Sequence, residues 1–412
     1  MALSIPASAF SRIAQLAADR RVHKAFRWLH LQEQLLLRWQ AELVGVPAPP
    51  FGEGPRADWL CERFRELGLD EVYLDAIGNA IGVRKGTAEP DAEGRTVLLS
   101  AHIDTVFPAD TTIEWKLEGT RLEAPGACDN GAGVVCMLAI AAALAHAEIE
   151  HGCDLIFAGN VGEEGEGDLR GMRRIYEAPG FRESVAAHIV LDGAGHEVAI
   201  THGLGSRRFL VTIFGPGGHS WTDAGRPNPI VAMSQAIAQL SRLELAEAPR
   251  TTVNVGTIEG GTAINAIPEQ AAARFDFRSV DPEQLIHLEV ELYRAVEDAV
   301  IMANRNSGHS AGRGGLGFSI DNIGSRPAGQ LAEDTPLYET LRAVDRHLNI
   351  RTEPRIASTD ANIPLSLGVP AVSVGAGGEG GGIHTRSEWY DARGRELGLR
   401  RVLLLLLALA SC

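Results

Sequence analysis

The feature that most constrains this fold is a series of short apolar runs separated by helical segments, beginning near residue 96. The runs are Thr96–Ala101, Asp154–Ala158, His188–Leu191 and Ala371–Val374. Continuous apolar runs of this length are typical of strands that are covered on both faces. Val134–Ala147, which is rich in Ala and Leu, predicts a helix between the first two runs. Alternating strands and helices predict a mostly parallel α/β sheet with helices on both faces.

The pattern changes between about Gly205 and Arg326. Four strands are predicted at Arg208–Phe214, Thr251–Glu259, Ala271–Val280 and Leu316–Ile323. One helix is predicted at Pro229–Leu243, and a second begins at Pro282 after the capping residue Asp281. The order βαββαβ matches a ferredoxin-like split βαβ unit. We therefore predict an inserted domain at residues 204–326 and an α/β domain built from residues 1–203 and 327–412.

Composition excludes several classes of partner. The 412 residues carry 38 Lys and Arg against 53 Asp and Glu, a formal net charge of -15. An acidic surface repels phosphate backbones and anionic membranes, so neither nucleic acid nor a membrane is expected as a partner. The apolar run Val402–Ala410 is half of what a membrane span requires and predicts a C-terminal core helix.

The cysteines and the chain start bear on the compartment. The odd number of five scattered cysteines predicts reduced thiols, and the start shows no basic, apolar signal segment. Together these features predict a cytoplasmic protein. The N-terminal stretch before Val46 is helical in pattern, and its sequence leaves open whether it packs onto the core or across a dimer.

Side chains that can bind metal follow almost every strand of the predicted parallel sheet. Ligands bind at the carboxyl ends of such strands. His102 follows the first strand, and Asp104, two residues later, can orient its imidazole. Further candidates follow the other strands or lie in glycine-rich turns, and they are Asp129, Glu163, Glu164, Asp192 and His384.

Each signal alone also has a purely structural explanation. His102 and Asp104 can form a hydrogen-bonded core pair, and Glu163-Glu164 can be a solvated turn. Asp129-Asn-Gly and Asp192-Gly are ordinary turn sequences. The argument for a site is that all of these residues recur at one edge of one sheet.

Charge balance favours two metal ions. His102 and His384 offer neutral imidazoles, and Asp129, Glu164 and Asp192 offer carboxylates. Two Zn²⁺ can share five ligands if one carboxylate bridges, and a bridging hydroxide then brings the site to neutrality. Nitrogen and oxygen ligands suit zinc, and Co²⁺ or Mn²⁺ could take its place. Glu163 is left unbound beside the hydroxide, where it can serve as general base.

These residues resemble a known family. Ser100-Ala-His-Ile-Asp-Thr-Val106, Cys128-Asp-Asn-Gly131, Glu163-Glu164, Asp192 and His384 are similar to the two-zinc aminoacylase and carboxypeptidase G superfamily of metallopeptidases. The resemblance runs from about Pro49 to the C-terminus, and it implies a zinc-peptidase-like three-layer catalytic domain with an inserted lid or dimerisation domain.

The resemblance also implies residue roles. His102 and Asp192 would hold one zinc, Glu164 and His384 would hold the other, and the carboxylate of Asp129 would bridge the two. The Asp129–Asn130 peptide would be cis. In the inserted domain, His219 resembles the histidine that stabilises the oxyanion and that reaches the partner subunit's site in dimeric relatives. Asn265 and Arg278 resemble positions that contact substrate. A homodimer through the inserted domain is therefore expected.

The substrate prediction depends on two details. Asp at position 192 looks like the aminopeptidase and dipeptidase members, whereas Glu is more typical of carboxypeptidases and deacylases. Ser358–Asn362 and Gly380–His384 look like peptidase T-like proteins. We therefore predict hydrolysis of di- or tripeptides from a free amino end. An N-acyl amino acid amidohydrolase or carboxypeptidase remains the alternative, because it cleaves an amide with the same machinery. A catalytically silent binding protein is a third possibility, against which the intact Glu163 argues.

Overall fold

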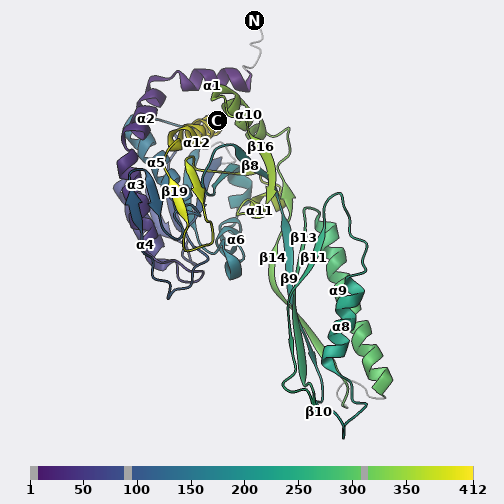
Figure 1. Ribbon diagram of the computed structural model, residues 1–412. Helices are drawn as coiled ribbons and strands as arrows, with labels where there is room; N and C mark the ends of the chain where they lie inside the picture. Colours follow the sequence, from purple (N-terminus) through teal and green to yellow (C-terminus); the bar gives the residue numbers. More distant parts are fainter. Residues whose placement is uncertain (1–7, 88–94, 308–313, 412) are drawn as a thin grey trace, which may run out of the picture. The chain divides into compact units, whose positions relative to one another are not determined.

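A computed structural model describes residues 8–87, 95–307 and 314–411. The chain divides into two compact units (Figure 1). Unit 1 comprises Met1–Gly203 and Gln330–Cys412, and unit 2 comprises Leu204–Gly329. The assignment of these units to catalysis and to dimerisation stays a prediction.

A mostly parallel sheet forms the centre of unit 1. The strand order is β1-β2-β6-β3-β7-β17-β8, with β16 paired to β8. The pairs β3–β6, β3–β7, β17–β7 and β16–β8 are parallel. The strands are β1 (Glu71–Leu74), β2 (Ala80–Arg84), β3 (Thr96–His102), β6 (Asp154–Asn160), β7 (Val185–Leu191), β8 (Val198–Gly203), β16 (Glu353–Ala357) and β17 (Ala371–Val374).

Alternate residues of β3 face two different helical layers. Val97 and Leu99 are fully buried in the core that contains α5 (Gly131–Ala147) and α12 (Arg395–Ala410). Leu98 packs in a second core with residues of α6 (Arg170–Tyr176) and α11 (Asn362–Ser366). Side chains of successive strand residues point to opposite faces, so the sheet is the middle of three layers, as the sequence predicts.

The N-terminal helices pack onto the core of their own chain. They are α1 (Ala9–Ala17), α2 (Arg20–Leu31) and α3 (Glu33–Val44), followed by α4 (Gly54–Glu66). Leu29, Leu36 and Leu37 are buried, whereas Leu31 is 62% exposed. The N-terminal helices therefore pack onto the core of the chain, one of the two arrangements that the sequence left open.

A small antiparallel sheet joins distant parts of unit 1. Its order is β18-β19-β5-β4, with β4 (Lys116–Glu118), β5 (Arg121–Glu123), β18 (Glu379–Gly381) and β19 (Trp389–Asp391). This sheet places the chain around His384 next to the turn that contains Asp129. The remaining helices of unit 1 are α7 (Phe181–Ser184) and α10 (Pro336–His347).

Unit 2 has the predicted βαββαβ order. Its main elements are β9 (Gly205–Phe214), α8 (Pro229–Leu240), β11 (Thr252–Gly260), β13 (Gln270–Ser279), α9 (Pro282–Ser307) and β14 (Gly317–Arg326). The sheet is antiparallel in the order β11-β13-β9-β14. Phe275 and Phe277 of β13 share a hydrophobic core with one face of α9, formed by Leu285, Leu288, Leu292 and Val296. The predicted α/β fold class is confirmed.

Cys61, Cys128 and Cys136 are free and buried, which agrees with the predicted reduced thiols. Among the described residues, no helix combines the length and the apolar character needed to cross a membrane.

Candidate metal centre

The carboxyl edge of the central sheet gathers the predicted ligands. His102 is the last residue of β3, Glu163 and Glu164 follow β6, and Asp192 follows β7. Because these three strands are parallel neighbours, their ends meet at the same edge. Asp129 reaches this edge from the turn before α5, and His384 from the loop between β18 and β19.

Asp129 lies at the centre of the cluster. Its Oδ1 is 3.1 Å from His102 Nε2, and its Oδ2 is 3.1 Å from His384 Nε2. On the outer sides, Asp192 Oδ1 lies 3.9 Å from His102 Nε2, and Glu164 Oε1 lies 2.9 Å from His384 Nε2. One carboxylate thus stands between two imidazoles, each of which has a further carboxylate beside it. His102, Asp129 and Glu164 each offer a ligand atom within 4.8 Å of the others.

Asp104 holds two of the metal-binding segments together. Its carboxylate is fully buried and accepts the backbone N–H groups of Glu163 at 3.0 Å and Glu164 at 2.8 Å. Its Oδ1 also lies 3.6 Å from His102 Nδ1. Asp104 thus lies beside the imidazole and fixes the loop that carries both glutamates, and its role in orienting the ring stays a prediction.

Glu388 holds the turn that presents Asp129, and sequence reasoning missed it. Its side chain is buried, with Oε2 accepting Gly126 N–H at 2.9 Å. Oε1 accepts the N–H groups of Cys128 at 2.8 Å and Asp129 at 2.7 Å. Glu388 lies four residues after His384, so one short segment supplies a ligand and also positions another. The only sequence signal was that spacing, which says nothing about burial.

Asn130 completes the turn. Its side-chain oxygen accepts Gly133 N–H at the start of α5 and Gly193 N–H, both at 3.1 Å. Its amide donates to the carbonyl of Leu191 at 2.8 Å. These bonds tie the Asp129 turn to the segment that carries Asp192. The Asp129–Asn130 peptide is cis, as predicted.

The electrostatics of the cluster suit cations. Burial and the nearby charge of Glu163 raise the pKa of Glu164 to about 7. Burial and the charge of Asp129 raise the pKa of Asp192 to about 7. The hydrogen bond to Asp129 raises the pKa of His384 to about 9. The buried carboxylates therefore disfavour one another's charged form, and bound cations would offset this repulsion.

The predicted residues of unit 2 do not all lie together. His219 in β10 (Gly218–His219) pairs with Ala266 in β12 (Ala266–Ile267), and Ser220 N–H donates to the carbonyl of Asn265 at 3.0 Å. Arg278 instead pairs with Ser206 near the opposite end of β13 and forms a 2.7 Å ion pair with Asp276. His219 and Asn265 thus share one ribbon, and Arg278 is separate from it.

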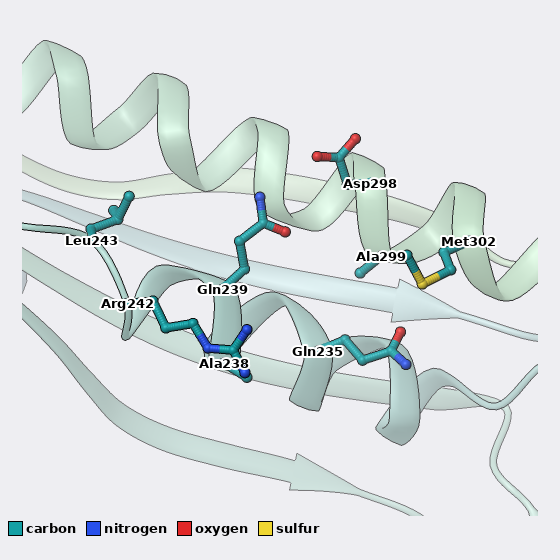
Figure 2. Close-up of a pocket in the computed structure, with 8 residues that line it drawn as sticks. All are labelled: Gln235, Ala238, Gln239, Arg242, Leu243, Asp298, Ala299 and Met302. Atoms are coloured by element: carbon teal, nitrogen blue, oxygen red, sulfur yellow. The ribbon is translucent and has the colours of Figure 1, made fainter.

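The pocket between α8 and α9 contains none of the predicted site residues. It encloses about 580 Å³ and is shown in Figure 2. Asp298 is its one carboxylate, and Gln235, Gln239 and Arg242 supply the other polar groups. A single carboxylate without histidine or cysteine is a poor set of metal ligands. The cluster at the sheet edge is therefore the candidate site.

Comparison with known proteins places the chain in a family. Residues 98–408 match the peptidase family M20/M25/M40. The chain belongs to this family. It is therefore a hydrolase of a metallopeptidase class, and the predicted resemblance and enzyme class are confirmed.

Two solved structures share the fold over most of the chain, and one relative in sequence matches about half of it. A tripeptidase from Staphylococcus aureus subsp. aureus Mu50 has a similar structure, with a TM-score of 0.74, 22% identity and coverage of 92% of this chain and 99% of that chain. Aminopeptidase PepT from Bacillus cereus ATCC 10987 gives a TM-score of 0.72 at 21% identity, with the same coverage. In sequence, IAA-amino acid hydrolase ILR1-like 5 of Arabidopsis thaliana is 30% identical over 48% of this chain and 47% of its own length.

The role of Glu388 leads to a first prediction. Glu388→Ala leaves three buried N–H groups without an acceptor and frees the Asp129 turn, so metal affinity should fall about 10- to 100-fold, the usual effect of losing a group that supports a ligand. Metal titration of the chelator-stripped protein measures this change. Glu379→Ala, at an exposed glutamate of the same region, is the control. Unchanged metal affinity in Glu388→Ala, with an unchanged circular dichroism spectrum, would contradict the assigned role.

Proposed function

We propose that this chain hydrolyses di- and tripeptides from the free amino end at a two-zinc site. The observation that carries the proposal is the position of Asp129, whose two oxygens lie 3.1 Å from two different imidazoles. That arrangement suits a carboxylate that bridges two ions. His102 and Asp192 would hold one ion, and Glu164 and His384 would hold the other.

The ligand set fits zinc. It contains two imidazoles and three carboxylates and no thiolate, because Cys128 is buried and burial raises its pKa to about 12. Zn²⁺ binds such nitrogen and oxygen ligands, and Co²⁺ or Mn²⁺ accepts the same set. When bound, the ions polarise the scissile carbonyl and lower the pKa of a water molecule.

Glu163 is assigned the proton transfers. Its backbone N–H is held by Asp104 at 3.0 Å, and its side chain is largely buried. Its charge helps to raise the pKa of Glu164, Asp192 and Asp360. In this position Glu163 accepts a proton from the attacking water and delivers it to the leaving nitrogen.

His219 is held in the form that can donate to an oxyanion. The backbone N–H groups of Trp221 and Thr222 donate to its Nδ1 at 3.2 Å and 3.4 Å. Because Nδ1 accepts, the neutral ring carries its proton on Nε2. An exposed Nε2–H group is a donor suited to the developing negative charge on the carbonyl oxygen. Asn265 on the same ribbon is assigned to substrate binding, and so is Arg278.

A homodimer through unit 2 is part of the proposal. The outer strands β11 and β14 each have one edge that no other described strand pairs with. The exposed side of α9 carries Ile286, Val290 and Tyr293, which recur at helical spacing and are 51%, 41% and 44% exposed. Open edges and an apolar stripe commonly pair across a two-fold axis.

The substrate class is supported by two similar structures, of a tripeptidase and of aminopeptidase PepT. The alternative, an N-acyl amino acid amidohydrolase or carboxypeptidase, is favoured by a different observation. Relatives in sequence include an IAA-amino acid hydrolase and proteins named as probable carboxypeptidases. Asp at position 192, in place of Glu, is why we place aminopeptidase activity first.

A direct comparison of substrates tests the proposal. The zinc-loaded protein should cleave a free tripeptide and release its first residue, and it should leave the N-acetylated tripeptide and N-acetyl-leucine intact. Chelation should abolish the activity, and adding Zn²⁺ back should restore it. Amino-acid analysis of the products measures each step. Turnover of N-acetyl-leucine alone would establish the alternative function.

The role of Glu163 gives a third prediction. Glu163→Gln keeps the shape of the side chain and removes the base, so kcat should fall about 10²- to 10⁴-fold while two metal ions remain bound. Stopped assays with metal analysis of the same sample measure both quantities. Near wild-type turnover would remove Glu163 from the mechanism.

A site shared between subunits gives a fourth prediction. Glu163→Gln and His219→Ala should each be nearly inactive as homodimers. A heterodimer, isolated after co-expression with two different tags, should regain roughly half of wild-type activity, because one of its two sites combines an intact Glu163 with the partner's intact histidine. No recovery would show that both residues act within one subunit, and a monomer in light scattering would exclude the dimer.

A further inference from the structure

The loop that precedes α4 is fastened to the metal-binding edge of unit 1 at two points. Thr105, which lies three residues after His102, donates its backbone N–H to the carbonyl of Ala48 at 2.9 Å. The buried Arg56 donates to the carbonyl of Val46 through Nε at 3.0 Å and to that of Ile103 at 2.8 Å. The loop is therefore held alongside the segment that carries Asp104.

The tip of this loop is a rigid turn that presents Phe51. Gly52 N–H donates to the carbonyl of Pro49 at 2.8 Å, which closes a turn with Pro50 and Phe51 at its centre. Phe51, the third residue of the turn, has a φ of 69°. A type II turn requires a positive φ at its third residue, and glycine adopts this conformation without cost. A bulky residue in this region is uncommon and costs about 1 kcal/mol or more. Nevertheless, the side chain is 68% exposed, so burial in the core does not compensate for the strain.

Arg170 links Phe51 to the loop that carries Glu163, the proposed general base. Its guanidinium lies over the Phe51 ring at 4.8 Å, and its Nη2 is 2.6 Å from Oε1 of the buried Glu53. The stem of the same side chain packs against Gly162, where an added Cβ would lie 2.7 Å from Arg170 Cγ. Gly162 directly precedes Glu163. The aromatic ring is thus supported from behind by a side chain that touches the loop of the general base.

We propose that Phe51 forms the apolar wall of the subsite for the residue whose nitrogen leaves, which is the second residue of the peptide. This inference rests on the proposed function. The ring is exposed, strained and fixed at the same sheet edge as the metal-binding residues, on the side of Glu163. Glu163 delivers its proton to the leaving nitrogen, so the side chain next to that nitrogen is the one that meets the ring. An aromatic ring that Arg170 supports on one side and that is otherwise largely exposed selects an apolar side chain there.

The variant Phe51→Gly separates this role from a structural one. Glycine relieves the strained φ, so thermal stability should stay the same or rise. The kcat/KM for Ala-Leu-Gly should fall about tenfold or more, the usual effect of losing contacts to an apolar group, mostly through KM. For Leu-Ala-Gly it should change less than about twofold, because the leucine then occupies the first position. Phe51→Leu, which keeps an apolar side chain, should retain most of the preference.

Leu31→Ala, at an exposed leucine of α2, is the matched control and should leave both peptides unaffected. Equal losses on the two peptides, or no loss on Ala-Leu-Gly, would overturn the assignment of Phe51. Failure of the proposed function has a different signature, because wild-type protein would then cleave neither peptide. If only N-acyl amino acids are cleaved, comparing N-acetyl-leucine with N-acetyl-glycine applies the same test, since the amino acid is again the leaving group.

Discussion

Asp129 is the residue on which the rest of the site depends, because it is the carboxylate that both imidazoles share. His102 comes from the end of β3 and His384 from a loop more than 250 residues later, and both lie 3.1 Å from an oxygen of Asp129. A bridging carboxylate has little freedom, since moving one oxygen moves the other. Its turn is accordingly held by Glu388 from one side and by Asn130 from the other. The surrounding residues thus fix the backbone rather than the carboxylate itself.

The same arrangement concentrates negative charge where water is scarce. Asp104, Asp129, Glu163, Glu164 and Asp360 are buried or nearly so at one edge of the sheet. Burial alone would protonate several of them, and the raised pKa values of Glu164, Asp192 and Asp360 reflect this. Asp104 and Asp129 are exceptions. His102 and two backbone N–H groups keep the pKa of Asp104 low despite burial, and hydrogen bonds to His102 and His384 keep the pKa of Asp129 low. The cluster therefore contains two carboxylates whose charge the protein itself balances and others whose charge bound cations would balance.

The sequence predicted those parts of the fold and site that depend on the apolar periodicity of strands and helices and on the residues at strand ends. The parallel strands, the βαββαβ order and the positions of His102, Glu164 and Asp192 after their strands follow from apolar patterns, because parallel strands place successive loops at one edge. Glu388 could not be predicted in this way. A glutamate in a loop is usually solvated, and its burial depends on the small sheet that β19 forms with β5, two short strands far apart in sequence. The strained φ of Phe51 is equally invisible, since Pro-Pro-Phe-Gly indicates a turn but not which residue adopts the left-handed conformation.

The side chains at the carboxyl edge of the central sheet are held by rigid parts of the backbone. The metal-binding side chains are carried by strand ends, by a helix start and by loops with paired backbone groups, so little reorganisation is needed when substrate binds. Phe51 follows the same rule, since two prolines, a closed turn and the Arg170–Glu53 pair hold an apolar ring in solvent. Such a ring loses little conformational freedom on binding, so more of its contact with substrate remains as affinity. The cost is a strained backbone that glycine would relieve, and a fold selected for stability alone would not retain it. On the proposed function, a strained, exposed aromatic ring beside the Glu163 loop is held there for the substrate that it contacts.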